Sequence, residues 1–152
     1  MLLIFGFLVM VFLFVGMGLL SGMRLMQIVD LPTALMIIVP LILFLILTKG
    51  GNVINRYIKT SFTKGHTYTG PELAGLSAAI RNTIKFILGT GGLGFLFGLI
   101  SILMNLQVPQ MLGPNIAISL FSVLYSIAIS FFVFFPIQAW AENKLNALKG
   151  DA

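Results

Sequence analysis

The chain has 152 residues, of which 59% are hydrophobic and 9% are charged. This composition excludes an ordinary soluble domain, because about a quarter of the residues are charged in such proteins. With no cysteine and one histidine, His66, the chain also offers no disulfide framework and no thiolate or histidine cluster for a metal.

Four apolar stretches approach or reach the length needed to cross a bilayer, which is about 20 helical residues. They cover residues 2–20, 31–48, 86–105 and 115–140, and none contains Asp, Glu, Lys, Arg or His. We therefore predict an all-α integral membrane protein with four transmembrane helices and a single membrane domain over residues 1–152. It brings no proton-carrying side chain into the bilayer.

The first two spans carry local signals at their ends. Span 2–20 has no basic segment before it and no small-residue cleavage site after it, which predicts an uncleaved anchor. Asp30 is predicted to cap the second helix at the outer surface, and Pro32 suits its first turn. Pro40 lies in the middle of the second span and is predicted to kink it.

The connection 49–85 begins with a segment in which apolar residues recur at helical spacing and basic residues lie between them. The apolar set is Ile54, Tyr57, Ile58 and Phe62, and the basic pair is Arg56 and Lys59. This pattern predicts a short amphipathic helix over 53–62 that lies at the inner surface, with docking of a partner as the alternative role. A polar turn at 64–70 follows, in which His66 is expected to be solvated.

Pro71 and Glu72 then mark the start of another helix. Its apolar residues Leu73, Leu76, Ile80 and Ile84 share one face, and no breaker intervenes before Gly89. We therefore expect the third helix to extend below the membrane into the cytoplasm without interruption.

The segment 108–114 is predicted to be a brief outer loop, after which Gly113 and Pro114 start the fourth span. Pro136 lies near the inner end of that span, as a kink or a moving hinge. Trp140 is a natural anchor at the membrane interface, and Glu142 is expected to be a charge of the tail.

The basic residues indicate the orientation. Of nine Lys and Arg residues, six lie in the connection 49–85, one lies between the first two spans and none lies between the last two. Positive charge concentrates on the cytoplasmic side of membrane proteins. The connection and both termini are therefore predicted to be cytoplasmic, and the net charge of +5 is a topology signal rather than a nucleic-acid footprint.

Small and hydroxyl-bearing residues form one stripe on each of the last two spans, each within an arc of roughly 80°. The stripes are Gly91, Gly94, Gly98, Ser101 and Asn105 on the third span, and Ser119, Ser122, Ser126 and Ser130 on the fourth. Tyr125 borders the second stripe. One interpretation is close helix packing, in which small faces let backbones approach. The other is a narrow path, or a cradle for a foreign helix, in which hydroxyls meet a partly dehydrated cation.

No catalytic constellation is present in the sequence: there is no Ser/His/Asp arrangement, no pair of carboxylates inside the spans and no glycine-rich phosphate loop. We therefore expect a protein that is not an enzyme and that holds no cofactor beyond a transported ion.

The last two spans resemble those of MotA-type stator subunits, in the MotA/TolQ/ExbB ion-channel family. The resemblance is carried by the run 91–100, by Asn105-Leu106, by 112–117, by Leu124-Tyr125 and by Phe134-Phe135-Pro136-Ile137. The segment 29–35 is also similar to the Asp-x-Pro-Ser segment that opens the family's second span.

The resemblance implies a homo-oligomeric ring, typically of five copies, around a single-span MotB/TolR/ExbD-like partner whose intramembrane Asp binds a proton or a sodium ion. It implies a location in the bacterial inner membrane. By position, Ser122 stands where the family often has a pore-facing Thr, and Pro136 where it has a proline linked to conformational change. The ion-path candidates are accordingly Ser119, Ser122, Ser126, Thr90 and Tyr125, and the packing or partner-facing candidates are Gly91, Gly94, Gly98, Ser101 and Ser130.

The chain departs from this family in three ways. The family's proline that opens the third span falls at Leu88, and its small or Thr position falls at Phe95. The large cytoplasmic domain of flagellar members is replaced by the short connection 49–85, so energising another envelope process is at least as consistent as turning a flagellar rotor. A structural membrane adaptor, a holin-like pore that acts alone and a small solute carrier remain as alternatives.

Overall fold

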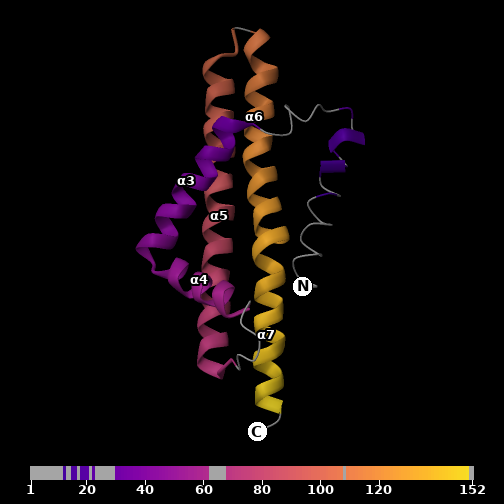
Figure 1. The fold of residues 1–152 in the computed structure, drawn as a ribbon. Coiled ribbons are helices and arrows are strands. Elements are labelled where there is room, and N and C mark those ends of the chain that lie inside the picture. The colour runs from indigo at the N-terminus through magenta and orange to yellow at the C-terminus, as the bar shows by residue number, and fades with distance from the viewer. Residues whose placement is uncertain are drawn as a thin grey trace.

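The computed structural model describes residues 30–61, 68–107 and 109–150, together with Phe12, Val15, Gly16, Gly18, Leu19, Leu20 and Gly22. Every regular element in these ranges is helical. The helices are α3 (Leu31–Leu47), α4 (Gly50–Ser61), α5 (Gly70–Met104), α6 (Pro109–Ala128), the π-helix η1 (Ile129–Phe134) and α7 (Phe135–Gly150) (Figure 1). Most of the predicted first span, the loop with Arg24 and the turn with His66 lie outside the described residues.

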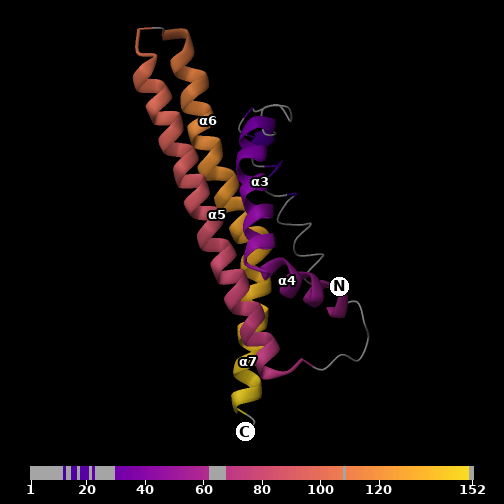
Figure 2. The same ribbon diagram turned by 90° about the vertical axis from the view of Figure 1, so that its left-hand side faces the viewer.

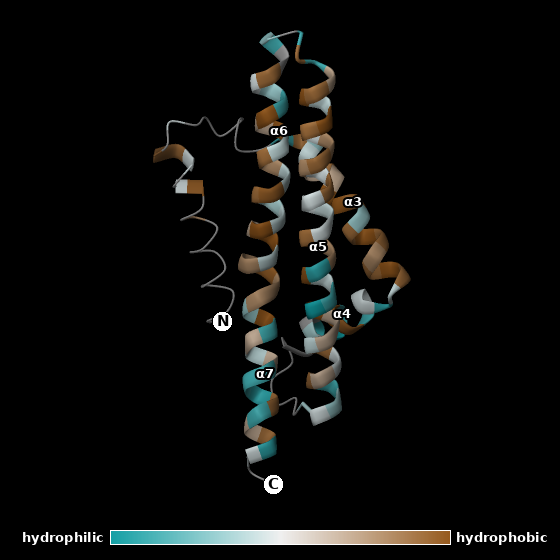
Figure 3. Ribbon diagram, turned by 180° about the vertical axis from the view of Figure 1, so that it is seen from behind, coloured by the Kyte–Doolittle hydropathy of each residue, from teal (hydrophilic) through white to brown (hydrophobic). Residues whose placement is uncertain are grey.

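A long antiparallel hairpin dominates the structure. α5 pairs with the continuous run of α6, η1 and α7, and the two arms are joined by a short turn that includes residues 105–107 (Figures 1 and 2). Both arms, Gly70–Met104 and Leu112–Gly150, are long and apolar enough to cross a membrane. Figure 3 shows hydrophilic residues in α7 and in the lower part of α5, while the upper arms are mostly hydrophobic. The described chain is thus an all-helical protein of membrane character.

The start of α5 confirms the sequence prediction to within one residue. Thr69 and Glu72 form a capping box, in which the Glu72 carboxylate accepts from the Thr69 backbone N–H at 3.1 Å, and Pro71 occupies the first turn. Leu73, Leu76 and Ile80 are almost fully buried against α7 and α4. The helix then runs without a break to Met104. The predicted extension below the apolar span is therefore confirmed.

The start of the fourth span was predicted wrongly. α6 begins at Pro109, and Pro114 lies inside it rather than at its first position. A proline at the first helical position loses no hydrogen bond, so Pro109 can begin the helix, and no strong breaker separates it from Gly113. The connection between the two arms is therefore shorter than the predicted loop 108–114.

α3 and α4 form the outer part of the fold. Asp30 caps α3 as predicted, because its carboxylate accepts from the Thr33 backbone N–H at 3.1 Å, and Pro32 lies in the first turn. Pro40 lies inside α3, which has 17 residues. α3 and α4 meet at an angle of 93°, so the pair can be counted as one broken span or as a span followed by a surface helix. Lys49 adopts a left-handed φ of 55° at this bend.

Candidate functional site

The two predicted stripes meet along the upper half of the hairpin, and we call this contact the glycine–serine seam. It consists of Gly91, Gly94 and Gly98 of α5 against Ser119, Ser122 and Ser126 of α6. A Cβ atom added at Gly94 would lie 2.8 Å from the Cβ of Ser122, and one added at Gly98 would lie 2.9 Å from the Cα of Ser119. These distances leave no room for any side chain on the glycine face. The seam therefore depends on glycine for the close approach of the two backbones.

The serine hydroxyls of the seam are buried and make short local hydrogen bonds. Ser119, Ser122 and Ser126 are each no more than 2% exposed. The Ser119 hydroxyl donates to the Asn115 carbonyl at 2.7 Å, and the Ser126 hydroxyl donates to the Val123 carbonyl at 2.8 Å. Ser122 can donate to the Ser119 carbonyl at 2.7 Å or across the seam to the Gly91 carbonyl at 3.2 Å. Within the chain, these hydroxyls serve helix packing.

The other two ion-path candidates lie at the margin of the seam. Thr90 is half-buried and donates to the Phe86 carbonyl at 2.9 Å. The Tyr125 hydroxyl, also half-buried, accepts from the Asp30 backbone N–H at 2.7 Å. This bond ties the cap of α3 to α6. Sequence reasoning missed it, because no local pattern pairs residues 95 positions apart.

The seam continues towards α7 into an irregular turn. Ser130 lies in η1, is 1% exposed, and its hydroxyl has no hydrogen-bond partner in the described part of the chain. The Phe135 N–H donates to the Ser130 carbonyl, and Pro136 is the next residue. Since proline has no N–H, it cannot make the next i→i+5 bond, to the Phe131 carbonyl. The predicted kink or hinge at Pro136 therefore coincides with a π turn, a feature that often marks functional segments of helices.

Ser101, which was assigned to packing, lies near the C-terminal end of α5. It is half-buried, and its carbonyl accepts from the Asn105 side chain at 2.7 Å. Asn115 lies on the opposite arm, and its side-chain nitrogen is buried without a hydrogen-bond partner in the described ranges. The end of the stripe near the turn between α5 and α6 is thus less tightly closed than the seam.

Glu142 is more than a charge of the tail. Its Oε1 atom accepts from the Ser77 hydroxyl at 2.8 Å and from the Gln138 side-chain nitrogen at 2.9 Å, which joins α7 to the lower part of α5. These two hydrogen bonds, from Gln138 first and then Ser77, together with the nearby Arg81, outweigh desolvation and lower the pKa of Glu142 below its ordinary value of 4.5. The i, i+4 spacing of Gln138 and Glu142 was a readable signal for part of this cluster.

The lowered pKa predicts a pH-dependent stability difference. The folded state favours the ionised carboxylate, so the stabilisation is present above about pH 4.5 and is lost as the pH falls through the lowered pKa. Glu142→Gln should therefore have a lower melting temperature than the wild type at pH 7. Its loss of unfolding free energy should be less than about 1 kcal/mol, because the carboxylate is partly exposed. The difference should shrink towards pH 3 in a thermal-melting series. A deficit that stays constant down to pH 3 would contradict the role of the charge.

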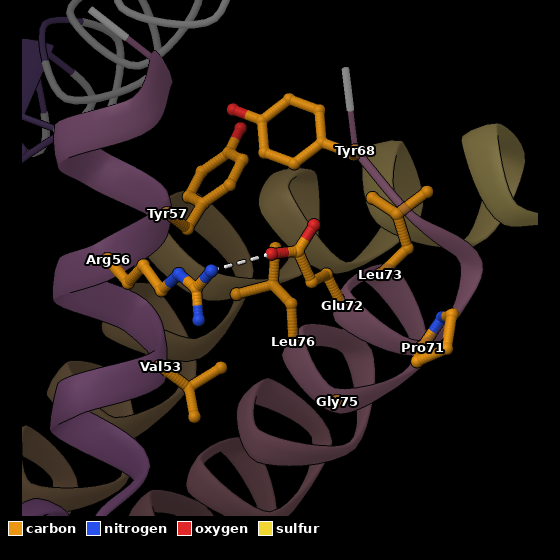
Figure 4. Close-up of a pocket in the computed structure, with 9 residues that line it drawn as sticks. All are labelled: Val53, Arg56, Tyr57, Tyr68, Pro71, Glu72, Leu73, Gly75 and Leu76. Carbon is orange, nitrogen blue, oxygen red and sulfur yellow. Dashed lines mark hydrogen bonds and ion pairs between the residues drawn. The ribbon is translucent and has the colours of Figure 1, made fainter. Parts of the chain in front are cut away.

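An aromatic cluster lies beside this contact, where α4 meets the hairpin. The rings of Tyr57, Tyr68 and Trp140 lie 5.2 to 6.0 Å from one another, and the Lys144 ammonium lies 5.0 Å from the Tyr68 ring centre and 5.2 Å from that of Trp140. The predicted anchor Trp140, which belongs to α7, thus packs against Tyr57 of α4 and against Tyr68. A pocket opens next to this cluster, and Arg56 and Glu72 form an ion pair across it at 2.9 Å (Figure 4).

The chemistry available to these sites is limited. Among the residues that the structure describes, no three His, Cys, Asp or Glu side chains gather where they could hold a metal ion. The seam offers hydroxyls and carbonyls, and the region where α4 and α7 meet the start of α5 offers carboxylate, ammonium and guanidinium groups. The arrangement suits close helix packing and contact with polar or charged partners.

Comparison with known proteins gives two partial matches. The chain is 45% identical over 63 residues to an uncharacterised protein, YtxD, of Bacillus subtilis (strain 168), and 43% identical over 47 residues to the chemotaxis protein PomA of Vibrio alginolyticus. These stretches cover 41% and 31% of the chain but only 23% and 19% of the two relatives. No protein-family model matches the chain. The chain is therefore similar, over part of its length, to proteins several times longer than the matched segments.

Proposed function

We propose that the chain is the ring-forming subunit of an ion-driven complex in the bacterial inner membrane. In this proposal it crosses the membrane four times with both termini in the cytoplasm. About five copies surround a single-span partner, which supplies the intramembrane Asp. Passage of a proton or a sodium ion along that carboxylate drives mechanical work on the cell envelope or on a rotor.

The observation that carries the proposal is a hairpin of two long apolar helices without an ionisable side chain in its predicted spans, 86–105 and 115–140. A buried ionisable group in a membrane is costly and usually functional. A chain that supplies only hydroxyls and carbonyls to its spans has no titratable group of its own there, so the proposal takes the ion-binding carboxylate from another subunit. This division of roles is the central element of the proposal.

The exposed faces of the hairpin are consistent with contacts to lipid or to neighbouring subunits. Leu93, Leu96 and Leu103 of α5 are 56%, 53% and 67% exposed, and Leu120 and Phe131 of the other arm are 57% and 53% exposed. Apolar surface of this extent marks a membrane or a protein–protein interface. In a ring of copies within a bilayer, lipid and neighbouring subunits would together cover this apolar surface.

The partial similarity to the chemotaxis protein PomA supports a loose link to the MotA-type family. It agrees with the resemblance carried by residues 91–137 and favours a bacterial inner membrane as the location. A structural adaptor is the second candidate, and the tightness of the glycine–serine seam favours it, because the seam explains both stripes as packing surfaces.

The two candidates differ in their use of the hydroxyl groups. Thr90 and Tyr125 are half-buried and can meet another helix without a change in the chain. Ser119, Ser122 and Ser126 can meet an ion only if the seam opens, since α5 covers them. The proposal therefore places Thr90 and Tyr125 first on the path, with the three serines reached in an opened state.

Affinity purification of the chain from its native membrane tests the partnership. A ring subunit should co-purify with a single-span protein that carries an intramembrane Asp, and vesicles holding both should take up protons or sodium when a membrane potential is applied. Replacing that Asp by Asn should abolish the flux. An adaptor should show no flux with any partner, and a holin-like pore should leak ions when reconstituted alone.

Substitution of the hydroxyl residues tests the path itself. Ser122→Ala and Thr90→Val are expected to lower the ion flux of the complex several-fold while the ring still assembles, because each removes a hydroxyl and little volume. Ser101→Ala, outside the proposed path, is the matched control. Equal flux in all three variants would remove these residues from the path without removing the ring.

A further inference from the structure

The pocket beside the aromatic cluster is built for a polar group above an apolar floor. It has a volume of about 210 Å3 and lies between α4 and the first turns of α5. Val53 and Tyr57 of α4 and Leu73 and Leu76 of α5 line it, and the Arg56–Glu72 ion pair crosses it (Figure 4). A volume of this size holds a headgroup and not the acyl chains of a lipid, which would stay in the bilayer.

The ion pair is weak enough to be exchanged. The side chains of Arg56 and Glu72 are 72% and 30% exposed. Exposed pairs of this kind contribute only about 0–1 kcal/mol. The phosphodiester of a lipid headgroup binds a guanidinium in a bidentate way, as a carboxylate does, and carries the same single negative charge. An anionic headgroup can therefore compete with Glu72 for Arg56.

The position of α4 brings the pocket to the level of lipid headgroups. α4 turns from α3 by 93°, so it lies roughly along the membrane surface if α3 crosses the bilayer. Tyrosine and tryptophan, present here as Tyr57, Tyr68 and Trp140, favour this interfacial layer.

The pocket lining holds one basic and one acidic side chain, Arg56 and Glu72, but the described part of the chain from Lys49 onward is basic. From Lys49 onward, the described residues include seven basic side chains and two acidic ones. The basic set is Lys49, Arg56, Lys59, Arg81, Lys85, Lys144 and Lys149, and the acidic pair is Glu72 and Glu142. α4 itself contains no acidic residue. The anionic lipids of the cytoplasmic leaflet attract such clusters with about 1 kcal/mol per basic residue near the surface.

We propose that this pocket binds the headgroup of an anionic phospholipid from the cytoplasmic leaflet. The phosphate pairs with Arg56, and the glycerol lies against the apolar floor. Free phosphate would leave those apolar walls unused, and this favours the lipid as occupant. The proposal rests on the membrane character of the chain and on the orientation proposed above, which places α4 on the cytoplasmic side, and not on a ring or on ion coupling.

Trp140 provides the readout, because it is the only tryptophan in the chain and lies in the cluster next to the pocket. The purified full-length protein in a neutral detergent is titrated with phosphatidylglycerol, with phosphatidylcholine and with inorganic phosphate. The expected result is a saturable change in tryptophan fluorescence with phosphatidylglycerol, at least tenfold weaker binding of phosphatidylcholine and no saturation with phosphate. Equal binding of the two lipids, or saturation with phosphate alone, would overturn the proposal.

Two matched pairs of variants place the site. Gly75 lines the pocket and Gly89 does not, and a Cβ atom at either would meet nothing within 4 Å. Gly75→Leu should fill the pocket and weaken phosphatidylglycerol binding about tenfold, while Gly89→Leu should leave it unchanged. Arg56→Gln should weaken it similarly, and Lys149→Gln, which removes a charge outside the pocket, should have a smaller effect. Wild-type binding by Gly75→Leu would show that the lipid does not occupy this pocket.

Discussion

Replacing Gly98 by alanine is expected to push α5 and α6 apart and to lower the melting temperature by about 10 °C. The added methyl group would overlap the Ser119 hydroxyl and lie 2.9 Å from the Ser119 Cα, so a rotamer change alone cannot relieve the contact. Overpacking in a closed interior costs about 1–3 kcal/mol, and more where backbone must move. For a chain of this length, about 3 kcal/mol corresponds to a shift of about 10 °C. Thermal melting of the purified protein in detergent measures it.

Two further variants separate this steric effect from a general effect of alanine. Gly89→Ala adds the same methyl group to the same helix where nothing lies within 4 Å, and it should be neutral or stabilising by about 0.5–1 kcal/mol. Adding Ser119→Gly to Gly98→Ala removes the side-chain part of the clash and should recover part of the lost stability, while the 2.9 Å approach to the Cα of residue 119 remains. If Gly98→Ala has the same melting temperature as Gly89→Ala, or if Ser119→Gly restores no stability to Gly98→Ala, the seam does not hold the hairpin together.

The seam could be predicted from the sequence because its residues recur at the spacing of one helix face. Gly91, Gly94 and Gly98 repeat at intervals of three and four, as do the serines of the other arm, and both faces are therefore continuous. The periodicity does not show whether such a face packs against another helix of the chain, a partner or an ion path. The structure shows that the two faces meet each other, which supports the packing interpretation within one chain, whereas their part in an ion path remains a prediction.

Local signals predicted the ends of helices better than the contacts between them. Pro71 and Glu72 are local signals, and the start of α5 was predicted to within one residue. Asp30 was expected to cap α3, but its bond to the distant Tyr125 was not foreseen. Glu142 was assigned to the solvated tail because its partner Ser77 lies on another helix, 65 residues away in sequence. The prediction that Gly113 and Pro114 start the helix was wrong, because the helix already begins at Pro109.

Replacing Pro136 by alanine is expected to convert η1 into regular α-helix and to break the contact between Ser77 and Glu142. Between the seam and this contact, α5 uses 14 residues, from 77 to 91, while the other arm uses 16, from 126 to 142. The i→i+5 turn of η1 takes up extra residues within the same length. Without the proline, the helix regains an N–H donor and up to about 3 kcal/mol. The hydrogen bonds of a partly exposed Glu142 are worth less than this, so the regular helix should win.

The chain has no cysteine, so a short bismaleimide crosslink between cysteines introduced by the paired substitutions Ser77→Cys and Glu142→Cys reports this register. Its yield should be high with Pro136 present and should fall about tenfold with Pro136→Ala, because α7 rotates by about 100° for each residue that the turn releases. Pro114→Ala, which removes a proline from α6 above the seam, should leave the yield unchanged. An unchanged yield in Pro136→Ala would mean that contacts between α5 and α7, rather than the proline, hold the π turn in place. Pro136 could then not act as the hinge.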